Sequence, residues 1–263
     1  MSADPINPVA PESTLPYPPL FKGKKFVVLS DWDGTITTKD SNDFMTDTLG
    51  MGVEGRRQLN HDILTEKDTF RDGFRKMMES VVANGHSYEE CKEHLRANIQ
   101  LDPGFLEFYN FCKANDIPII IVSSGMEPTI RAVLSNLLPA EAAETIPIIS
   151  NDAEYLDDTP EHKKWTIKYR HPSSGFGHDK SQSIIPYTSL PPDERPVTIF
   201  FGDGVSDMSA AKHADHLFVK LKSFGENDLA AYCTREGIPH RTFTDFSDVV
   251  PVVREMVEKA KSA

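Results

Sequence analysis

The sequence lacks the features of a secreted or membrane-embedded protein. It has no apolar run near the ~20 residues of a membrane-spanning helix, and its start is not a basic segment followed by an apolar stretch. It has only three cysteines, Cys91, Cys112 and Cys233. They are far apart, odd in number and without the spacing of a metal or redox motif. We therefore expect free thiols and a cytoplasmic protein without membrane contact.

Basic residues are also in deficit. The chain has 28 Lys and Arg against 40 Asp and Glu, for a formal net charge of −12. This balance argues against nucleic acid or an anionic membrane as a partner. An anionic substrate would be repelled by the protein as a whole, so cations close to the binding site must offset that field.

Short apolar segments alternate with helical patterns along the chain of 263 residues. This alternation predicts an α/β fold with a doubly wound parallel sheet. In such sheets ligands bind outside the carboxyl ends of the strands. Strands are expected at residues 26–29, 118–122, 146–150, 197–201 and 217–219. Helices are expected at about 103–115, 128–138, from 180, 206–214, 228–236 and 248–261.

Two segments differ from this pattern. Residues 1–20 contain six prolines and predict a flexible or draped arm. Residues 37–101 are polar, nearly free of proline and too long for a simple connection. Within them, apolar residues recur at helical spacing and predict a helix face turned to a core: Phe70, Phe74, Met77, Met78 and Val81. We therefore expect a small helical cap at 37–101, inserted into a core formed by 21–36 and 102–263.

The first strand ends in two carboxylates, Asp31 and Asp33. Two anions this close repel each other unless a cation or a shared proton lies between them. Gly34 then turns the backbone and leaves amides free to face an anion. A surface turn would also fit the pattern. A calcium loop fits poorly, because its glycine comes sixth and its glutamate twelfth, whereas Gly34 is fourth and Asn42 is twelfth.

Polar residues also follow two later strands. Residues 123–125 (Ser-Ser-Gly) end the second expected strand, and Asp203 and Asp207 follow the fourth. Each turn is common by itself, but their order after three apolar strands is more specific. If those strands are neighbours, three or four carboxylates converge into an oxygen-only site that favours Mg²⁺.

These motifs resemble the haloacid dehalogenase (HAD) superfamily of phosphohydrolases. The resemblance is carried by residues 31–35 (Asp-Trp-Asp-Gly-Thr), Ser123, Lys180 and residues 202–207 (Gly-Asp-Gly-Val-Ser-Asp). The insertion at 37–101 is similar to the helical cap of the phosphoserine phosphatase-like branch. More narrowly, residues 40–43, 122–126, 176–181 and 202–207 resemble a fungal branch that includes a yeast polyol phosphatase.

The residues predict hydrolysis of a phosphate monoester through an aspartyl-phosphate. Asp31 would attack phosphorus, and Asp33 would protonate the leaving alkoxide and later activate water. Ser123 and backbone amides would hold phosphoryl oxygens, and Lys180 would neutralise charge. The expected Mg²⁺ ligands are Asp31, the carbonyl oxygen of Asp33, Asp203 and Asp207, the last directly or through water.

The substrate is expected to be a small phosphorylated metabolite. Relatives that hydrolyse phosphoserine hold its charged ends with a cap acid and a cap arginine. Asp40 fits the place of the acid, but the place of the arginine falls near Met77, with Arg75 close by. A ligand with hydroxyl groups suits such a pocket better, so we expect a sugar-alcohol phosphate. Predicted substrate contacts are Gly34, Asp40, Asn42, Asp43, Arg75, Ser124 and His178.

Several alternatives stay open at this point. The substrate could be phosphoserine or an enol-phosphate of methionine salvage, and the reaction could be that of a phosphomutase. A protein that binds phosphate ligands without catalysis is a further possibility. Asp40 and Asn42 could simply cap a turn, Ser123 or Asp207 a helix, and His178 could pack a loop. The chain could be a monomer or a homodimer.

Overall fold

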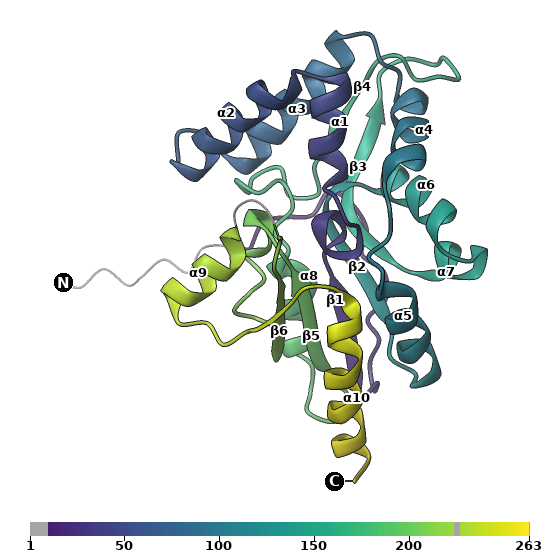
Figure 1. Ribbon diagram of the computed structural model, residues 1–263, viewed down its shortest axis with the longest axis vertical. Coiled ribbons are helices and arrows are strands. Elements are labelled where there is room, and N and C mark those ends of the chain that lie inside the picture. Colours follow the sequence, from purple (N-terminus) through teal and green to yellow (C-terminus); the bar gives the residue numbers. More distant parts are fainter. Residues whose placement is uncertain (1–9, 224–226, 263) are drawn as a thin grey trace, which may run out of the picture.

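A computed structural model describes residues 10–223 and 227–262 of the chain (Figure 1). Its centre is a seven-stranded sheet with the order β4-β3-β2-β1-β5-β6-β7. All neighbouring strands are parallel except β3 and β4, which form an antiparallel pair. The predicted parallel α/β sheet is therefore confirmed. The strands are β1 (Phe26–Ser30), β2 (Ile119–Met126), β3 (Ile148–Tyr155), β4 (Trp165–Lys168), β5 (Val197–Gly202), β6 (His216–Lys220) and β7 (Arg241–Phe243).

Helices cover both faces of the sheet and collect at one of its ends. No helix within the described ranges combines the length and apolar character needed to cross a bilayer. The helices are α1 (Ser41–Leu49), α2 (Gly52–Leu64), α3 (Phe70–Ala83), α4 (Tyr88–Asn98), α5 (Phe105–Ala114), α6 (Glu127–Leu137), α7 (Ala140–Thr145), α8 (Ser181–Thr188), α9 (Asp228–Glu236) and α10 (Phe246–Ser262).

The central strand β1 shows why the sheet is covered on both sides. All five of its residues are buried, and successive side chains point to opposite faces. Phe26 and Val28 belong to one apolar cluster with α5 and α10, whereas Val27 and Leu29 belong to another with α8 and α9. A strand that is apolar on both faces can only be stable between two layers of helices.

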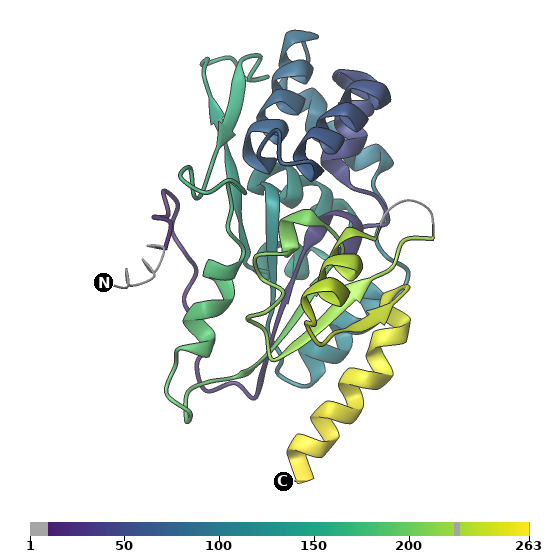
Figure 2. The ribbon, with the colours of Figure 1, turned by 90° about the vertical axis from the view of Figure 1, so that its left-hand side faces the viewer.

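Helices α1 to α4 occupy the segment predicted as a helical cap (Figures 1 and 2). Three of them begin at a capping residue, Asp40, Thr69 or Ser87, whose side chain accepts a hydrogen bond from a backbone N–H in the first turn of the helix. Helix α3 packs against β4 and α4 packs against α6. The cap helices are therefore joined to the sheet by packing as well as by their two chain connections.

One of the expected helices differs from the structure. The helix expected at 206–214 is only a short helical turn, Val205–Asp207, followed by further turns. Several backbone hydrogen bonds there join residues three apart, such as Met208 to Val205 and Ala210 to Asp207, which is tighter than an α-helix.

Of the expected arm, residues 1–9 lie outside the described ranges, and 10–20 form no helix or strand. All three cysteines are free, as predicted.

A buried ion pair links the two chain segments that connect the cap helices to the core with the end of β6. The Nζ of Lys220, at the end of β6, lies 2.5 Å from Asp102 Oδ2 and 2.8 Å from the carbonyl oxygen of Thr35. Asp102 Oδ1 also accepts bonds from the backbone N–H groups of Gly104 and Phe246. One carboxylate thus joins the starts of α5 and α10 to β6.

We expect Asp102→Ala to destabilise the protein by about 3–5 kcal/mol, because it leaves a buried ammonium without its partner. The measurement is the free energy of unfolding from urea titration. The control is Glu141→Ala, which removes an exposed ion pair with Lys113 and should cost no more than about 1 kcal/mol. Equal losses in the two variants would contradict the importance of the buried pair.

Candidate active site

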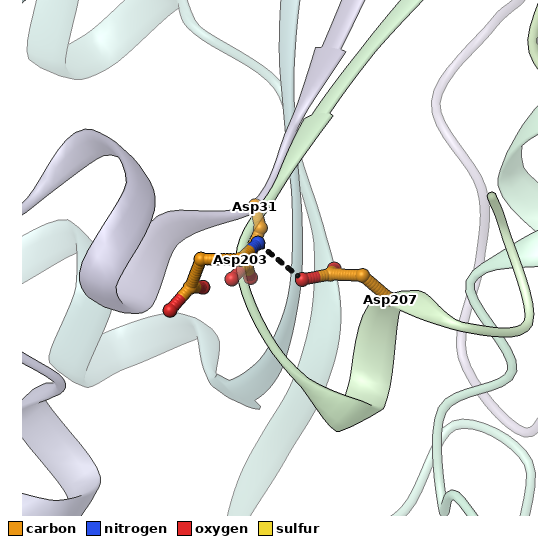
Figure 3. A group of neighbouring side chains, drawn as sticks. All are labelled: Asp31, Asp203 and Asp207. Atoms are coloured by element: carbon orange, nitrogen blue, oxygen red, sulfur yellow. Dashed lines mark hydrogen bonds between the residues drawn. The ribbon is translucent and has the colours of Figure 1, made fainter. Parts of the chain in front are cut away.

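Three buried aspartates meet at the carboxyl ends of the central strands (Figure 3). Asp31 follows β1, Asp203 follows β5, and Asp207 lies in the turn after β5. One carboxylate oxygen from each lies within 4.8 Å of the others. Because β1 and β5 are paired neighbours, the sheet itself brings these side chains together, as the strand-end positions predict.

Lys180 supplies the positive charge of this cluster. Its side chain is fully buried, and its Nζ lies 2.6 Å from Asp31 Oδ1 and 2.7 Å from Asp207 Oδ1. Burial alone would lower the pKa of Lys180, but Asp207 and Asp31 raise it, so the ammonium stays charged. Burial raises the pKa of Asp31, and Asp207 adds to that shift, while Lys180 opposes it.

The turn after β1 packs tightly against Asp203. Gly34 has a φ of +72°, a backbone conformation that favours glycine, and a Cβ there would lie 2.6 Å from Asp203 Oδ2. The hydroxyl of Thr35 donates to Asp203 Oδ1 at 3.2 Å. A side chain at position 34 would displace Asp203, so glycine is needed for both the turn and the carboxylate.

The carboxylate of Asp33 faces the cap instead of the aspartate cluster. Its Oδ1 accepts bonds from the backbone and the hydroxyl of Ser41, and its Oδ2 accepts one from Asn42 Nδ2 at 2.7 Å. Burial and the nearby Asp40 raise the pKa of Asp33, against the opposing bonds from Ser41. The first turn of α1 therefore fixes the orientation of this acid.

A second lysine, Lys222, reaches the site from the loop after β6. Its Nζ lies 2.6 Å from Asp203 Oδ2. Burial lowers the pKa of Lys222, but Asp203 more than offsets this effect and raises it. Lys222 is not among the residues predicted from sequence, although its position just after a strand is the signal that identified Asp31 and Asp203.

A cavity lies between the sheet edge and helices α1 to α3. Its polar side chains include Asn60, which no sequence signal marks, and its apolar wall includes residues predicted as core. Phe74 and Met77 are buried in the cap and also face this cavity. The cavity is lined by Asp31, Asp33, Asp40, Asn42, Asp43, Asn60, Ile63, Leu64, Phe70, Phe74, Met77, Ser123, Ser124, Gly125, Asp203, Gly204, Val205, Ser206, Lys222 and Asp228.

Three predicted substrate contacts lie away from this cavity. Arg75 pairs with Asp72 at 3.2 Å and lies over the ring of Tyr169. His178 is buried beneath the site, where its Nδ1 donates to the carbonyl oxygen of Ser123 at 2.7 Å. Gly34 lies under Asp203 and lines a neighbouring cavity. The structure therefore places His178 where the loop-packing alternative expects it, and not along the cavity.

The remaining predicted contacts lie along the cavity. Asp40 and Asn42 also hold local structure, because Asp40 caps α1 through the N–H of Asp43 and Asn42 binds Asp33. Burial and Asp40 raise the pKa of Asp43 to about 8, against the opposing charge of Arg56. The hydroxyl of Ser124 is buried and has no hydrogen-bond partner among the described residues.

The donor set suits a hard divalent cation. The clustered atoms of Asp31, Asp203 and Asp207 are all carboxylate oxygens, the ligand type that Mg²⁺ prefers, and among the described residues no sulfur or imidazole joins this cluster. The three carboxylates of the cluster are paired with two lysines, Lys180 and Lys222, so that one negative charge is left without a partner in these ion pairs. A further cation would reduce the remaining repulsion.

Residues 28–212 match the family model of haloacid dehalogenase-like hydrolases. The chain belongs to this family. It is 47% identical over 226 residues to Pdp3-interacting factor 1 of Schizosaccharomyces pombe, covering 86% of this chain and 93% of that protein. It is 40% identical over 245 residues to the polyol phosphate phosphatase of Saccharomyces cerevisiae, covering 90% of this chain and 96% of that protein.

The fold is also that of a solved phosphatase. A structure of phosphoserine phosphatase, an analogue of its phospho-aspartyl intermediate, matches with a TM-score of 0.61 and 15% identity, covering 87% of this chain and 99% of that chain. The resemblance stated from the motifs is confirmed, and this HAD family member is a phosphatase.

We expect Lys222→Met to bind Mg²⁺ more tightly than the unmodified protein when no substrate is present. The ammonium of Lys222 competes for Asp203, and its removal leaves that carboxylate free for a metal. Calorimetric titration with MgCl₂ measures the change. Lys39→Met is the control, because it removes the same charge from an exposed position nearby. Weaker binding by Lys222→Met would contradict competition.

Proposed function

We propose that the protein is a Mg²⁺-dependent hydrolase of small sugar-alcohol phosphates, with Asp31 as the nucleophile. The observation that carries this proposal is the position of Asp31. Its carboxylate lines the cavity and is held from below by Lys180, so that one face is open to a phosphoryl group. Splitting hydrolysis into formation and breakdown of an aspartyl-phosphate avoids one very slow direct step.

Asp33 is the proton donor and acceptor in this proposal. It lines the same cavity as Asp31 and is oriented by Ser41 and Asn42. Protonating the leaving alkoxide in the first step leaves Asp33 ionised. It can then take a proton from the water that cleaves the phosphorylated Asp31. A phosphomutase would need to keep its substrate through both steps.

Ser123 and Ser124 are proposed to bind phosphoryl oxygens. Both line the cavity, and the buried hydroxyl of Ser124 without a partner among the described residues is available to donate. Asp31, Asp203, Asp207 and the carbonyl oxygen of Asp33 would hold Mg²⁺. The bound ion would neutralise charge between the attacking carboxylate and the phosphate.

The lining of the cavity favours hydroxyl groups on the rest of the substrate. Asp40, Asp43 and Asn60 offer oxygen acceptors on the cap side, and Lys222 is the only Lys or Arg in the described lining. Arg75 is turned away, so the cap offers no guanidinium to the carboxylate of phosphoserine. The similarity to a polyol phosphate phosphatase over most of both chains supports the same substrate class.

An enol-phosphate with a thioether tail is the second candidate. It is favoured by the apolar side of the cavity, formed by Ile63, Leu64, Phe70, Phe74 and Met77. A thioether would bury its apolar surface there, whereas a polyol would leave that wall without a matching group. The polyol phosphate would therefore depend on the polar side of the cavity, and the thioether enol-phosphate on its apolar side.

We expect Asp31→Asn to lower kcat for an aryl phosphate by at least about 10⁴-fold, because the amide cannot form the phosphorylated intermediate. The assay uses the unmodified protein with MgCl₂ as reference, and EDTA should remove its activity. Circular dichroism and thermal unfolding verify that the variant is folded. Persistent turnover by Asp31→Asn would exclude the proposed nucleophile, and a lack of turnover by the unmodified protein would favour a binding protein.

We expect Asp43→Asn to raise KM for sugar-alcohol phosphates by about tenfold, because an amide NH₂ replaces one carboxyl oxygen that could accept from a substrate hydroxyl, and to leave an aryl phosphate unaffected. The panel also contains phosphoserine and the thioether enol-phosphate. Asp47→Asn is the matched control, because Asp43 and Asp47 both pair with Arg56 but only Asp43 lines the cavity. The substrate assignment is wrong if the unmodified protein prefers phosphoserine or the enol-phosphate.

A further inference from the structure

The proline-rich arm makes a concentrated set of contacts with one short segment of the core. We call residues 13–17 the arm contact. Thr14 donates from its backbone N–H to the carbonyl oxygen of Arg170 at 2.8 Å and from its hydroxyl to that of Tyr169 at 2.6 Å. The Nη1 of Arg170 lies 3.0 Å from the carbonyl oxygen of Leu15 and 3.1 Å from that of Pro16.

Arg170 is the centre of this contact. Arg170 is only 4% exposed, and its guanidinium lies 4.7 Å from the centre of the Tyr17 ring. A guanidinium has donors only and is costly to bury without acceptors. Most of its acceptors here are atoms of the arm, including Ser13 Oγ at 3.3 Å. The arm is therefore part of the folded structure from residue 13 onward.

One chain of hydrogen bonds leads from Arg170 to Ser124 in β2, one of the residues proposed to bind phosphate. The backbone N–H of Arg170 donates to Asn151 Oδ1 at 2.9 Å, and Asn151 Nδ2 donates to the carbonyl oxygen of Ser124 at 2.7 Å. Asn151 is fully buried, so solvent does not compete for these bonds. The position of the Ser124 carbonyl thus depends on the segment that holds the arm.

A second chain leads from Tyr17 toward Lys180. The N–H of Asp179 donates to His171 Nδ1 at 3.0 Å, so that nitrogen is an acceptor and Nε2 carries the proton. Nε2 then donates to the hydroxyl of Tyr17 at 2.8 Å. Burial lowers the pKa of His171 to about 4, in keeping with this neutral tautomer. The residue after Asp179 is Lys180, which contacts Asp31.

We propose that the arm contact positions the active site by holding together Ser123 and Ser124 in β2 and the loop that ends at Lys180. Both chains of hydrogen bonds pass through adjacent residues beneath the arm, the first through Arg170 and the second through His171. The arm residues touch neither substrate nor the reacting atoms, so their effect is on the geometry of the groups that do. The inference rests on the proposed function, because it assigns that site its supporting contacts.

The test compares two tyrosine variants in the full chain. Tyr17→Phe removes the hydroxyl that accepts from His171. Tyr187→Phe is the matched control, because its hydroxyl accepts a bond from the N–H of Phe21 at 3.3 Å and leads to no active-site residue. Each variant is assayed for kcat and KM with an aryl phosphate at saturating MgCl₂. Inhibition by orthovanadate, which mimics the pentacoordinate phosphorus, and thermal unfolding are measured alongside.

We expect Tyr17→Phe to lower kcat and weaken vanadate inhibition by about tenfold, with little change in KM, because small displacements of reacting groups are costly. Tyr187→Phe should change the unfolding temperature similarly and leave kcat unchanged. The proposal is overturned if the two variants have the same kcat, or if Tyr17→Phe changes KM alone. If the unmodified protein lacks turnover, the proposed function fails, and vanadate binding still decides the role of the arm.

Discussion

Repulsion among carboxylates at one edge of the sheet is the constraint on which this structure depends. Asp31, Asp203 and Asp207 are buried with carboxylate oxygens within 4.8 Å of one another, an arrangement that is unfavourable without compensating charge. Lys180 compensates Asp31 and Asp207, and Lys222 compensates Asp203. The same concentration of charge makes the site suited to a divalent cation and a phosphoryl group.

The cap takes a direct part in this site. Its first turn supplies Ser41 and Asn42 to Asp33, while its apolar helix face encloses the cavity. Asp33, the proposed proton donor, is therefore oriented by the same element that encloses the cavity. The Asp102–Lys220 pair joins the carbonyl of Thr35, just after this acid, to the end of β6.

Several of the site residues predicted from sequence lie at or near the ends of apolar strands, whereas Lys180 was predicted from the family resemblance. Asp31, Ser123 and Asp203 were predicted because parallel strands end at one edge of the sheet. Arg75 was misplaced because positions on a helix face cannot be assigned without its neighbours. Arg75 and Met77 are two residues apart in α3, so they point to nearly opposite sides, and only Met77 faces the cavity.

Local chain chemistry by itself determined five of the seven described strands, the acidic turns and the presence of an inserted helical segment, because periodicity and turn residues act over a few neighbours. Tertiary structure decided which side chains pair across the chain. Lys222 meets Asp203, Asn42 meets Asp33, and Tyr17 meets His171 only after distant segments pack together. These pairings depend on the relative placement of whole elements, and no short stretch of sequence specifies that placement.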